Sequence, residues 1–219
     1  MRTFLIPGLV AIVAAFVFLV AEDALGAAAP FVKAVPVAIL SYVVSLAGPR
    51  PGKGRARISG IFGLAAMGLA CAALADWVIE YSFLGGLVTF LVTHLFYIAA
   101  FIMMERTLKG WRLVPVVVWA ALALPVLSGG AGALRLPVLI YGTVIFVMIW
   151  RAAATVSGLG RNAATFTFAG ALLFGLSDTL LGYNRFVSPL PASGFLILGT
   201  YWAAQTMIAT AFACPEPSS

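Results

Sequence analysis

The segment 163–181, AATFTFAGALLFGLSDTLL, carries one charged residue, Asp178, in an otherwise largely apolar run. Its length approaches the roughly 20 residues that an α-helix needs to cross a bilayer. Seven other segments have the same character: Phe4–Ala21, Val32–Leu46, Ile58–Ala75, Phe83–Met104, Leu113–Leu127, Leu136–Trp150 and Gly194–Ala213. Backbone groups in lipid must be paired within the segment, and the alternating pattern of a barrel is absent. We therefore expect an all-α integral membrane protein with eight transmembrane helices.

The composition leads to the same class of protein. Of 219 residues, 63% are hydrophobic and 9% are charged, whereas a soluble domain carries about 25% charged residues. These values exclude a water-soluble enzyme and a disordered chain. Eight helices use about 160 residues, so we expect a single membrane domain over residues 1–219 without an extramembrane domain.

The basic residues divide unevenly between the two sides of the bilayer. Lys33, Arg135 and Arg185 fall on one side. Ten fall on the other: Arg2, Arg50, Lys53, Arg55, Arg57, Arg106, Lys109, Arg112, Arg151 and Arg161. Loops rich in Lys and Arg stay in the cytoplasm, so we expect both termini there, in a multi-pass protein of a bacterial inner membrane. The loops are too short to form a basic aromatic groove, and the net charge of +6 therefore does not indicate nucleic-acid binding.

Equal spacings indicate an internal duplication. Lys33 and Arg135 each stand shortly before a proline that opens an apolar segment, and an aspartate follows each of them 43 residues later, Asp76 and Asp178. Four helices return the chain to its starting side, so the two halves would be parallel repeats about an axis along the membrane normal. The candidate repeats are 1–110 and 111–219. Chance similarity between apolar helices is the alternative.

The first segment has a second interpretation. Arg2, the apolar stretch after it and Ala27–Ala29 together resemble a cleavable signal peptide. Pro7 and Gly8 shorten the continuous apolar run, which also fits such a peptide. The duplication favours a retained first helix, because four helices are needed in each half.

The two aspartates are the strongest candidates for chemistry, because ionisable groups inside membrane helices are costly and usually functional. Counted at 1.5 Å per residue, Asp76 lies ~27 Å along its segment and Asp178 ~22 Å along its own. We expect both in the outer part of the bilayer at similar heights, where pseudosymmetry brings them face to face. Paired carboxyl groups in water-poor surroundings differ in protonation, so one can donate a proton while the other accepts one. The alternative is that each marks a helix end at the interface.

Small residues share a helix face with each aspartate. Ala65, Gly68 and Ala72 share the face of Asp76, whereas Ala171, Gly175 and Gly182 share that of Asp178. Such faces are typical of tight helix contacts. A groove for a hydrocarbon chain leading to the aspartates is the second interpretation.

Further polar side chains lie inside two other segments. His94 and Tyr97 share a face of the fourth, and Tyr201 and Gln205 share a face of the eighth. Hydrogen bonding between helices is the simplest role for all four. One histidine and two scattered cysteines, Cys71 and Cys214, do not make a metal site, so we expect neither a metal nor another cofactor.

Several motifs of this chain resemble the YhhN family of integral-membrane lysoplasmalogenases. They are His94–Phe101 (HLFYIAAF), Gly170–Asp178 (GALLFGLSD) followed by Asn184-Arg185-Phe186, Tyr201-x-x-x-Gln205 and Lys33-x-x-Pro36. The likeness runs from about Phe31 to Ala211. The family usually has Gly-Asp in its third helix, and this chain has Ala75-Asp76.

The resemblance implies an eight-helix membrane hydrolase that cleaves the vinyl ether bond of lysoplasmalogens to a fatty aldehyde and a glycerophospho-alcohol. It implies that Asp76 and Asp178 are the catalytic residues. His94, Tyr97, Tyr201, Gln205 and Asn184 would then position substrate or water, and Lys33 and Arg185 would contact the lipid phosphate. The expected partners are a lysolipid substrate and the bilayer.

A proton-coupled transporter of small molecules or lipids is the main alternative function. Eight helices, a duplication and paired membrane aspartates would suit it, and matched helix breaks would favour it. Pro36 and Pro137 match in position, but each lies near an expected helix start, where proline is tolerated. A non-catalytic scaffold would leave the two buried carboxylates without a role.

Overall fold

The computed structural model describes residues 13–21, 24–49, 55–156 and 161–213. Within them the chain is helical apart from short turns and 3₁₀ segments. The helices are α2 (Ala29–Ala47), α3 (Ala56–Val78), α4 (Phe83–Met104), α5 (Leu113–Gly129), α6 (Arg135–Thr155), α7 (Arg161–Phe186) and α8 (Ser193–Ala213). Each matches one expected segment, and most extend it by a few residues.

Seven of the described helices are long and apolar enough to cross a membrane. Residues 13–21 are also helical and belong to the expected first helix, Phe4–Ala21. The earlier part of that helix lies outside the described residues, as do Pro7 and Gly8 of the signal-peptide interpretation. The all-helical membrane architecture is confirmed, and the eighth span stays a prediction.

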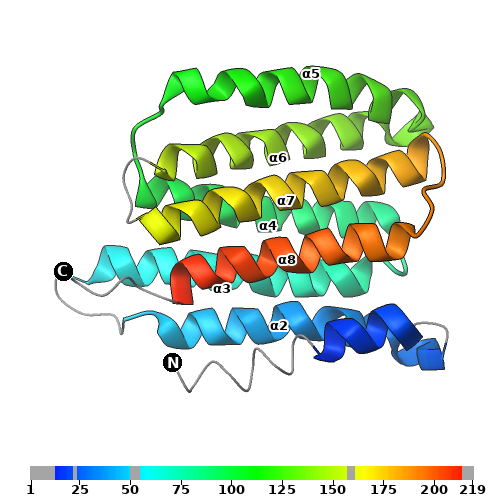
Figure 1. The fold of residues 1–219 in the computed structure, drawn as a ribbon, viewed down its shortest axis with the longest axis horizontal. Coiled ribbons are helices and arrows are strands. Elements are labelled where there is room, and N and C mark those ends of the chain that lie inside the picture. The colour runs from blue at the N-terminus through cyan, green and yellow to red at the C-terminus, as the bar shows by residue number, and fades with distance from the viewer. Residues whose placement is uncertain (1–12, 22–23, 50–54, 157–160, 214–219) are drawn as a thin grey trace.

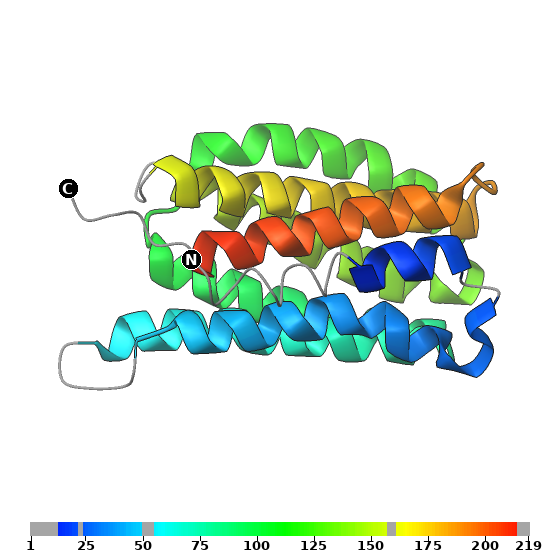
Figure 2. The same ribbon diagram turned by 60° about the horizontal axis from the view of Figure 1, so that its bottom comes forward.

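The helices run side by side along one direction (Figures 1 and 2). In the first half α3 packs between α2 and α4, and in the second half α7 packs between α6 and α8. The halves meet where α4 packs against α6 and where α2 packs against α8. If α2, α3 and α4 are exchanged with α6, α7 and α8, each of these helix contacts corresponds to another of them. This arrangement supports the duplication, which stays a prediction.

Helix starts depend on local sequence. The Oγ of Ser82 accepts a hydrogen bond from Gly85 N at 3.0 Å and caps α4 after a short turn from α3. Helix α2 begins at Ala29, with Pro30 in its first turn. Pro36 therefore lies two turns inside α2 and is buried, so its expected place near a helix start was wrong. Pro137 lies near the start of α6 as expected, so the two prolines are not matched helix breaks.

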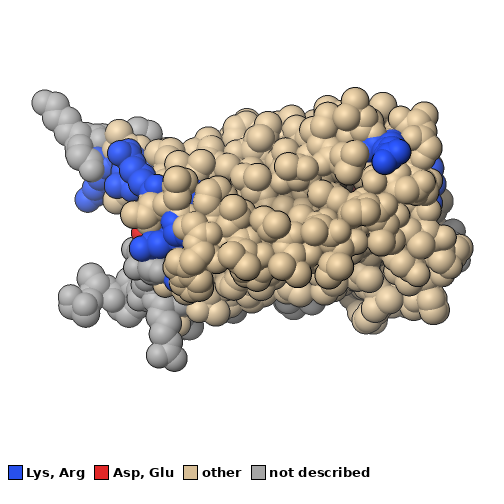
Figure 3. All heavy atoms as spheres, turned by 90° about the horizontal axis from the view of Figure 1, so that it is seen from above, with Lys and Arg blue, Asp and Glu red and all other residues tan. Residues whose placement is uncertain are grey.

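Basic side chains gather at the end of the bundle where α3, α5 and α7 begin, as the blue atoms of Figure 3 show. We call this the basic end. There Arg57 donates to Met103 O, and the buried Arg151 donates to the carbonyl oxygens of Glu105 and Thr107. These cations satisfy carbonyls in and after the last turn of α4, where the helix dipole favours positive charge.

Candidate active site

Asp76 lies two residues before the end of α3 and is buried, with 2% of its surface exposed. The side chains of Ala65 and Ala72 on the same face are fully buried. The hydroxyl of Tyr201, on α8, donates a hydrogen bond to Asp76 Oδ2 at 2.8 Å. Asp76 thus points into the bundle although it stands near a helix end, whereas its neighbour Trp77 is 37% exposed.

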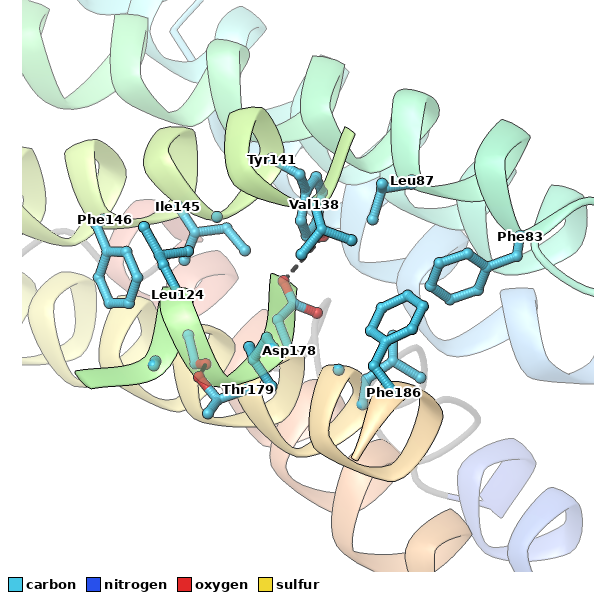
Figure 4. Close-up of a pocket in the computed structure, with 16 residues that line it drawn as sticks. Phe83, Leu87, Leu124, Val138, Tyr141, Ile145, Phe146, Asp178, Thr179 and Phe186 are labelled. Carbon is cyan, nitrogen blue, oxygen red and sulfur yellow. Dashed lines mark hydrogen bonds between the residues drawn. The ribbon is translucent and has the colours of Figure 1, made fainter. Parts of the chain in front are cut away.

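Asp178 lies inside α7, which continues for two turns to Phe186. The hydroxyl of Tyr141, on α6, donates to Asp178 Oδ2 at 2.9 Å, the dashed line in Figure 4. The Asp178 side chain is 10% exposed. Each aspartate therefore accepts a hydrogen bond from a tyrosine hydroxyl on a neighbouring helix.

His94 connects α4 to Asp178. Its Nδ1 bonds to the carbonyl oxygen of Phe90, and its Nε2 lies 3.7 Å from Asp178 Oδ2. A carbonyl only accepts, so Nδ1 carries the hydrogen, and Nε2 of a neutral ring is an acceptor. Within the described part of the chain Nε2 has no hydrogen-bond partner. The completely buried ring favours the neutral form, because an isolated buried charge is costly.

Both aspartates line one cavity of about 50 Å³, which we call the aspartate chamber. Lys33 of α2, Ser177 of α7 and Tyr201 also line it, together with apolar side chains. One water needs about 10–15 Å³ of such space and two to four polar partners. The chamber therefore has room for a few waters in contact with both carboxyl groups.

A second cavity, of about 40 Å³, also borders Asp178. We call it the apolar slot. It lies between α5, α6 and α7, next to the first residues of α4. Among the described residues its lining is apolar apart from Asp178, Tyr141 and Thr179. In Figure 4, Phe83 and Phe186 lie to one side of Asp178, and Phe146 and Leu124 lie to the other.

The remaining expected site residues occupy different places. Lys33 forms an ion pair with Glu80, beyond the end of α3. The hydroxyl of Tyr97 donates to Gln205 Oε1 at 2.6 Å, joining α4 to α8 inside the bundle.

The small-residue face of α3 packs against α4. A Cβ at Gly68 would lie 2.6 Å from the ring of Tyr97. The small-residue face of α3 is therefore a tight helix contact, and its interpretation as a chain groove was wrong.

Asn184 and Arg185 lie near the end of α7, outside the aspartate chamber. Asn184 Oδ1 accepts a hydrogen bond from Leu190 N at 2.8 Å and shapes the turn before α8. The guanidinium of Arg185 lies 5.2 Å from the ring centre of Phe83. Because Phe83 lines the apolar slot, Arg185 stands beside that cavity rather than at the carboxylates.

Tyr141 and Glu80 were missed by the sequence analysis. Tyr141 has the one phenol hydroxyl in α6, and polar groups inside apolar segments were the signal that selected Tyr97 and Tyr201. Glu80 carries no motif that singles it out, and its pairing with Lys33 has no signal in their spacing. Within the described ranges, no three His, Cys, Asp or Glu residues gather to hold a metal ion. The expectation of no metal stays a prediction.

Comparison with known proteins places the chain among named relatives. It is 30% identical over 207 residues to lysoplasmalogenase TMEM86B of Homo sapiens, covering 93% of this chain and 84% of the relative. It is 36% identical over 180 residues to TMEM86B of Sus scrofa (81% and 72%) and 28% identical over 156 residues to lysoplasmalogenase of Mycobacterium tuberculosis (66% and 58%). No solved structure matches it significantly. Residues 28–212 match the YhhN family profile, and the chain belongs to the YhhN family.

Proposed function

We propose that this protein hydrolyses the vinyl ether bond of lysoplasmalogens. One observation carries the proposal: two buried carboxyl groups face a common chamber, and one of them also borders an apolar slot. Relatives at 28–36% identity are named lysoplasmalogenase. The substrate has one hydrocarbon chain joined through a vinyl ether to a polar glycerophospho group, so it needs an apolar cavity, an acid and water at one place.

The reaction needs a proton and a water at adjacent carbons. A proton adds to the β-carbon of the vinyl ether, the double bond supplies the electron pair, and an oxocarbenium ion results. Water then adds to the α-carbon and loses a proton to a carboxylate. The hemiacetal collapses to a fatty aldehyde and the free alcohol. Paired carboxylates hydrolyse glycosides through a similar oxocarbenium-like transition state.

Asp178 is suited to be the acid. It stands between the apolar slot and the aspartate chamber, so it can reach a carbon atom of a chain in the slot. The Nε2 lone pair of a neutral His94 faces Asp178 Oδ2, and such an acceptor favours a protonated carboxyl group opposite it. Tyr141 holds the carboxyl group in place.

Asp76 is suited to be the base. It borders the aspartate chamber but not the slot. Tyr201 donates to it just as Tyr141 donates to Asp178, so the distinction rests on Lys33, whose positive charge beside the chamber favours an ionised Asp76. An anion beside the chamber stabilises the oxocarbenium ion and takes a proton from the attacking water.

The polar end of the substrate belongs at the end of the bundle opposite the basic end. Phe186 ends α7 ~12 Å beyond Asp178 at 1.5 Å per residue. Arg185, beside Phe83, stands there and is suited to a lipid phosphate. Lys33 is paired with Glu80 and lines the chamber, so its charge acts on Asp76 and its water. With the basic end in the cytoplasm, the site opens toward the outer leaflet of a bacterial inner membrane.

The test uses purified protein in detergent and three lysolipids that differ only at the chain linkage: vinyl ether, saturated ether and ester. We expect aldehyde from the vinyl ether alone, detected by mass spectrometry. In D₂O the aldehyde should carry one deuterium on the carbon next to the carbonyl, because that carbon takes the proton. Release of a fatty acid from the ester, with no aldehyde from the vinyl ether, would contradict the proposal.

A further inference from the structure

A third cavity, of about 360 Å³, lies between α5, α6 and α7 closer to the basic end. Its lining includes Trp119 of α5, Ile149 of α6, and Phe168 and Leu172 of α7. We call it the lower cavity. The proposed reaction does not use it.

The apolar slot and the lower cavity are separated by a thin partition. A Cβ on Gly175, which lines the slot, would lie 2.6 Å from Ile149 Cδ1 and 3.2 Å from Trp119 Cη2. These two side chains also line the lower cavity. The ring of Trp119 is fixed by an edge contact to Phe146, which lines the slot, at a centroid distance of 5.4 Å.

The polarity of the three cavities favours one orientation of a bound lipid. The chamber and Arg185 offer charge at one side of Asp178, whereas the slot beyond Gly175 leads to a lining that is apolar apart from Arg112, whose guanidinium donates to Ala153 O. A hydrocarbon chain gains free energy where it leaves water for such surroundings. A substrate with its polar group near Arg185 therefore directs its chain past Asp178 toward Trp119.

Resting on the proposed function, we propose that the substrate's hydrocarbon chain lies along the apolar slot and that Trp119 determines the chain length by closing the slot from the lower cavity. The slot as it stands takes only the few carbons next to the vinyl ether, because its space of about 40 Å³ matches a few waters and Gly175 lies one helical turn from Asp178. Longer chains must displace the Trp119 indole to enter the lower cavity. Trp119 is thus a specificity-determining residue, outside the reacting groups.

The test replaces Trp119 with Ala, which removes the larger of the two side chains in the partition. The control is Leu122→Ala, on the same helix but 69% exposed. Hydrolysis rates are measured on lysoplasmalogens whose chains range from butenyl, which ends within the slot, to octadecenyl. Each methylene that gains an apolar environment is worth about fourfold in affinity. We expect Trp119→Ala to raise the ratio of kcat/KM for the longest to the shortest chain at least about tenfold, and Leu122→Ala to leave it unchanged.

Binding supplies a readout that does not depend on turnover. Saturated alkyl-ether lysolipids of the same lengths are titrated into each variant by native mass spectrometry. If the wild type releases no aldehyde but Trp119→Ala shifts binding toward long alkyl chains, the reaction is wrong and the chain site stands. If a folded Trp119→Ala keeps the wild-type length profile in both measurements, the chain site is wrong. Should Trp119→Ala not fold, Trp119→Phe decides, with a smaller shift in the same direction.

Discussion

Replacement of each aspartate by asparagine tests the two-carboxylate mechanism. Asp178→Asn removes the acid proton, and Asp76→Asn removes the charge that faces the oxocarbenium ion and accepts a proton from water. General acid–base catalysis contributes about 10²–10⁴-fold, so each variant should keep less than about a hundredth of the wild-type rate. Loss of the Asp76 charge should cost more than this, because a water-poor site strengthens electrostatic stabilisation.

The structure also predicts that both variants fold. An asparagine at position 178 can still accept the bond from Tyr141 through its carbonyl oxygen. An asparagine at position 76 can accept the bond from Tyr201 in the same way. Removing a carboxylate from a buried membrane position should not lower the thermal midpoint.

The assay is aldehyde release from a lysoplasmalogen in detergent, with thermal unfolding measured on the same preparations. Glu105→Gln is the matched control, because the Glu105 carboxylate accepts hydrogen bonds from Thr107 in the exposed loop after α4, and we expect wild-type activity from it. If either aspartate variant keeps more than about a tenth of the wild-type rate, the reasoning is refuted. If both lose activity only because they unfold, the aspartates are structural.

Three further outcomes are expected. A reporter fused after Ser219 should read out in the cytoplasm, and an external signal would overturn the orientation. Chelators should leave aldehyde release unchanged; activity that is lost to a chelator and restored by zinc would contradict the metal-free mechanism. Gly68→Ala should lower the thermal midpoint, since overpacking against the Tyr97 ring costs about 1–3 kcal/mol, whereas Gly63→Ala, with open space around it, should raise it slightly. Equal shifts of the thermal midpoint in these two variants would show that the Tyr97 ring moves aside at little cost.

Much of the fold follows from the sequence because each helix must satisfy its own backbone in lipid. Apolar runs therefore give the helices to within a few residues, as at Phe83–Met104, where expectation and structure coincide. The spacing of Asp76 and Asp178 indicated a common height, and both line one chamber. The spacing did not predict which side chains contact the aspartates. The tyrosine partners of Asp76 and Asp178 come from α8 and α6, and the sequence of one helix does not reveal which helices pack against it.

The small-residue faces of α3 and α7 show why the surroundings of the site could not be predicted from the sequence. Gly68 and Gly175 have the same character on their own helices. A Cβ would lie 2.6 Å from the Tyr97 ring at Gly68 and 2.6 Å from Ile149 Cδ1 at Gly175, but Gly175 also lines the apolar slot. The difference arises from side chains on other helices, which a one-helix pattern does not contain. The sequence therefore left two interpretations of each face, a tight helix contact or a groove for a hydrocarbon chain. The side chains of the neighbouring helices decide between them.

The position of Asp178 explains how one carboxyl group can contact both a hydrocarbon chain and water. A lysoplasmalogen brings an insoluble chain and a polar group, and its hydrolysis adds water to the carbon where they join. Asp178 faces the apolar slot with one side and the aspartate chamber with the other. Asp76, limited to the chamber, never needs to contact the chain. This division lets the water stay with Asp76 while the alkenyl carbon meets Asp178, so proton and water reach adjacent carbons from different cavities.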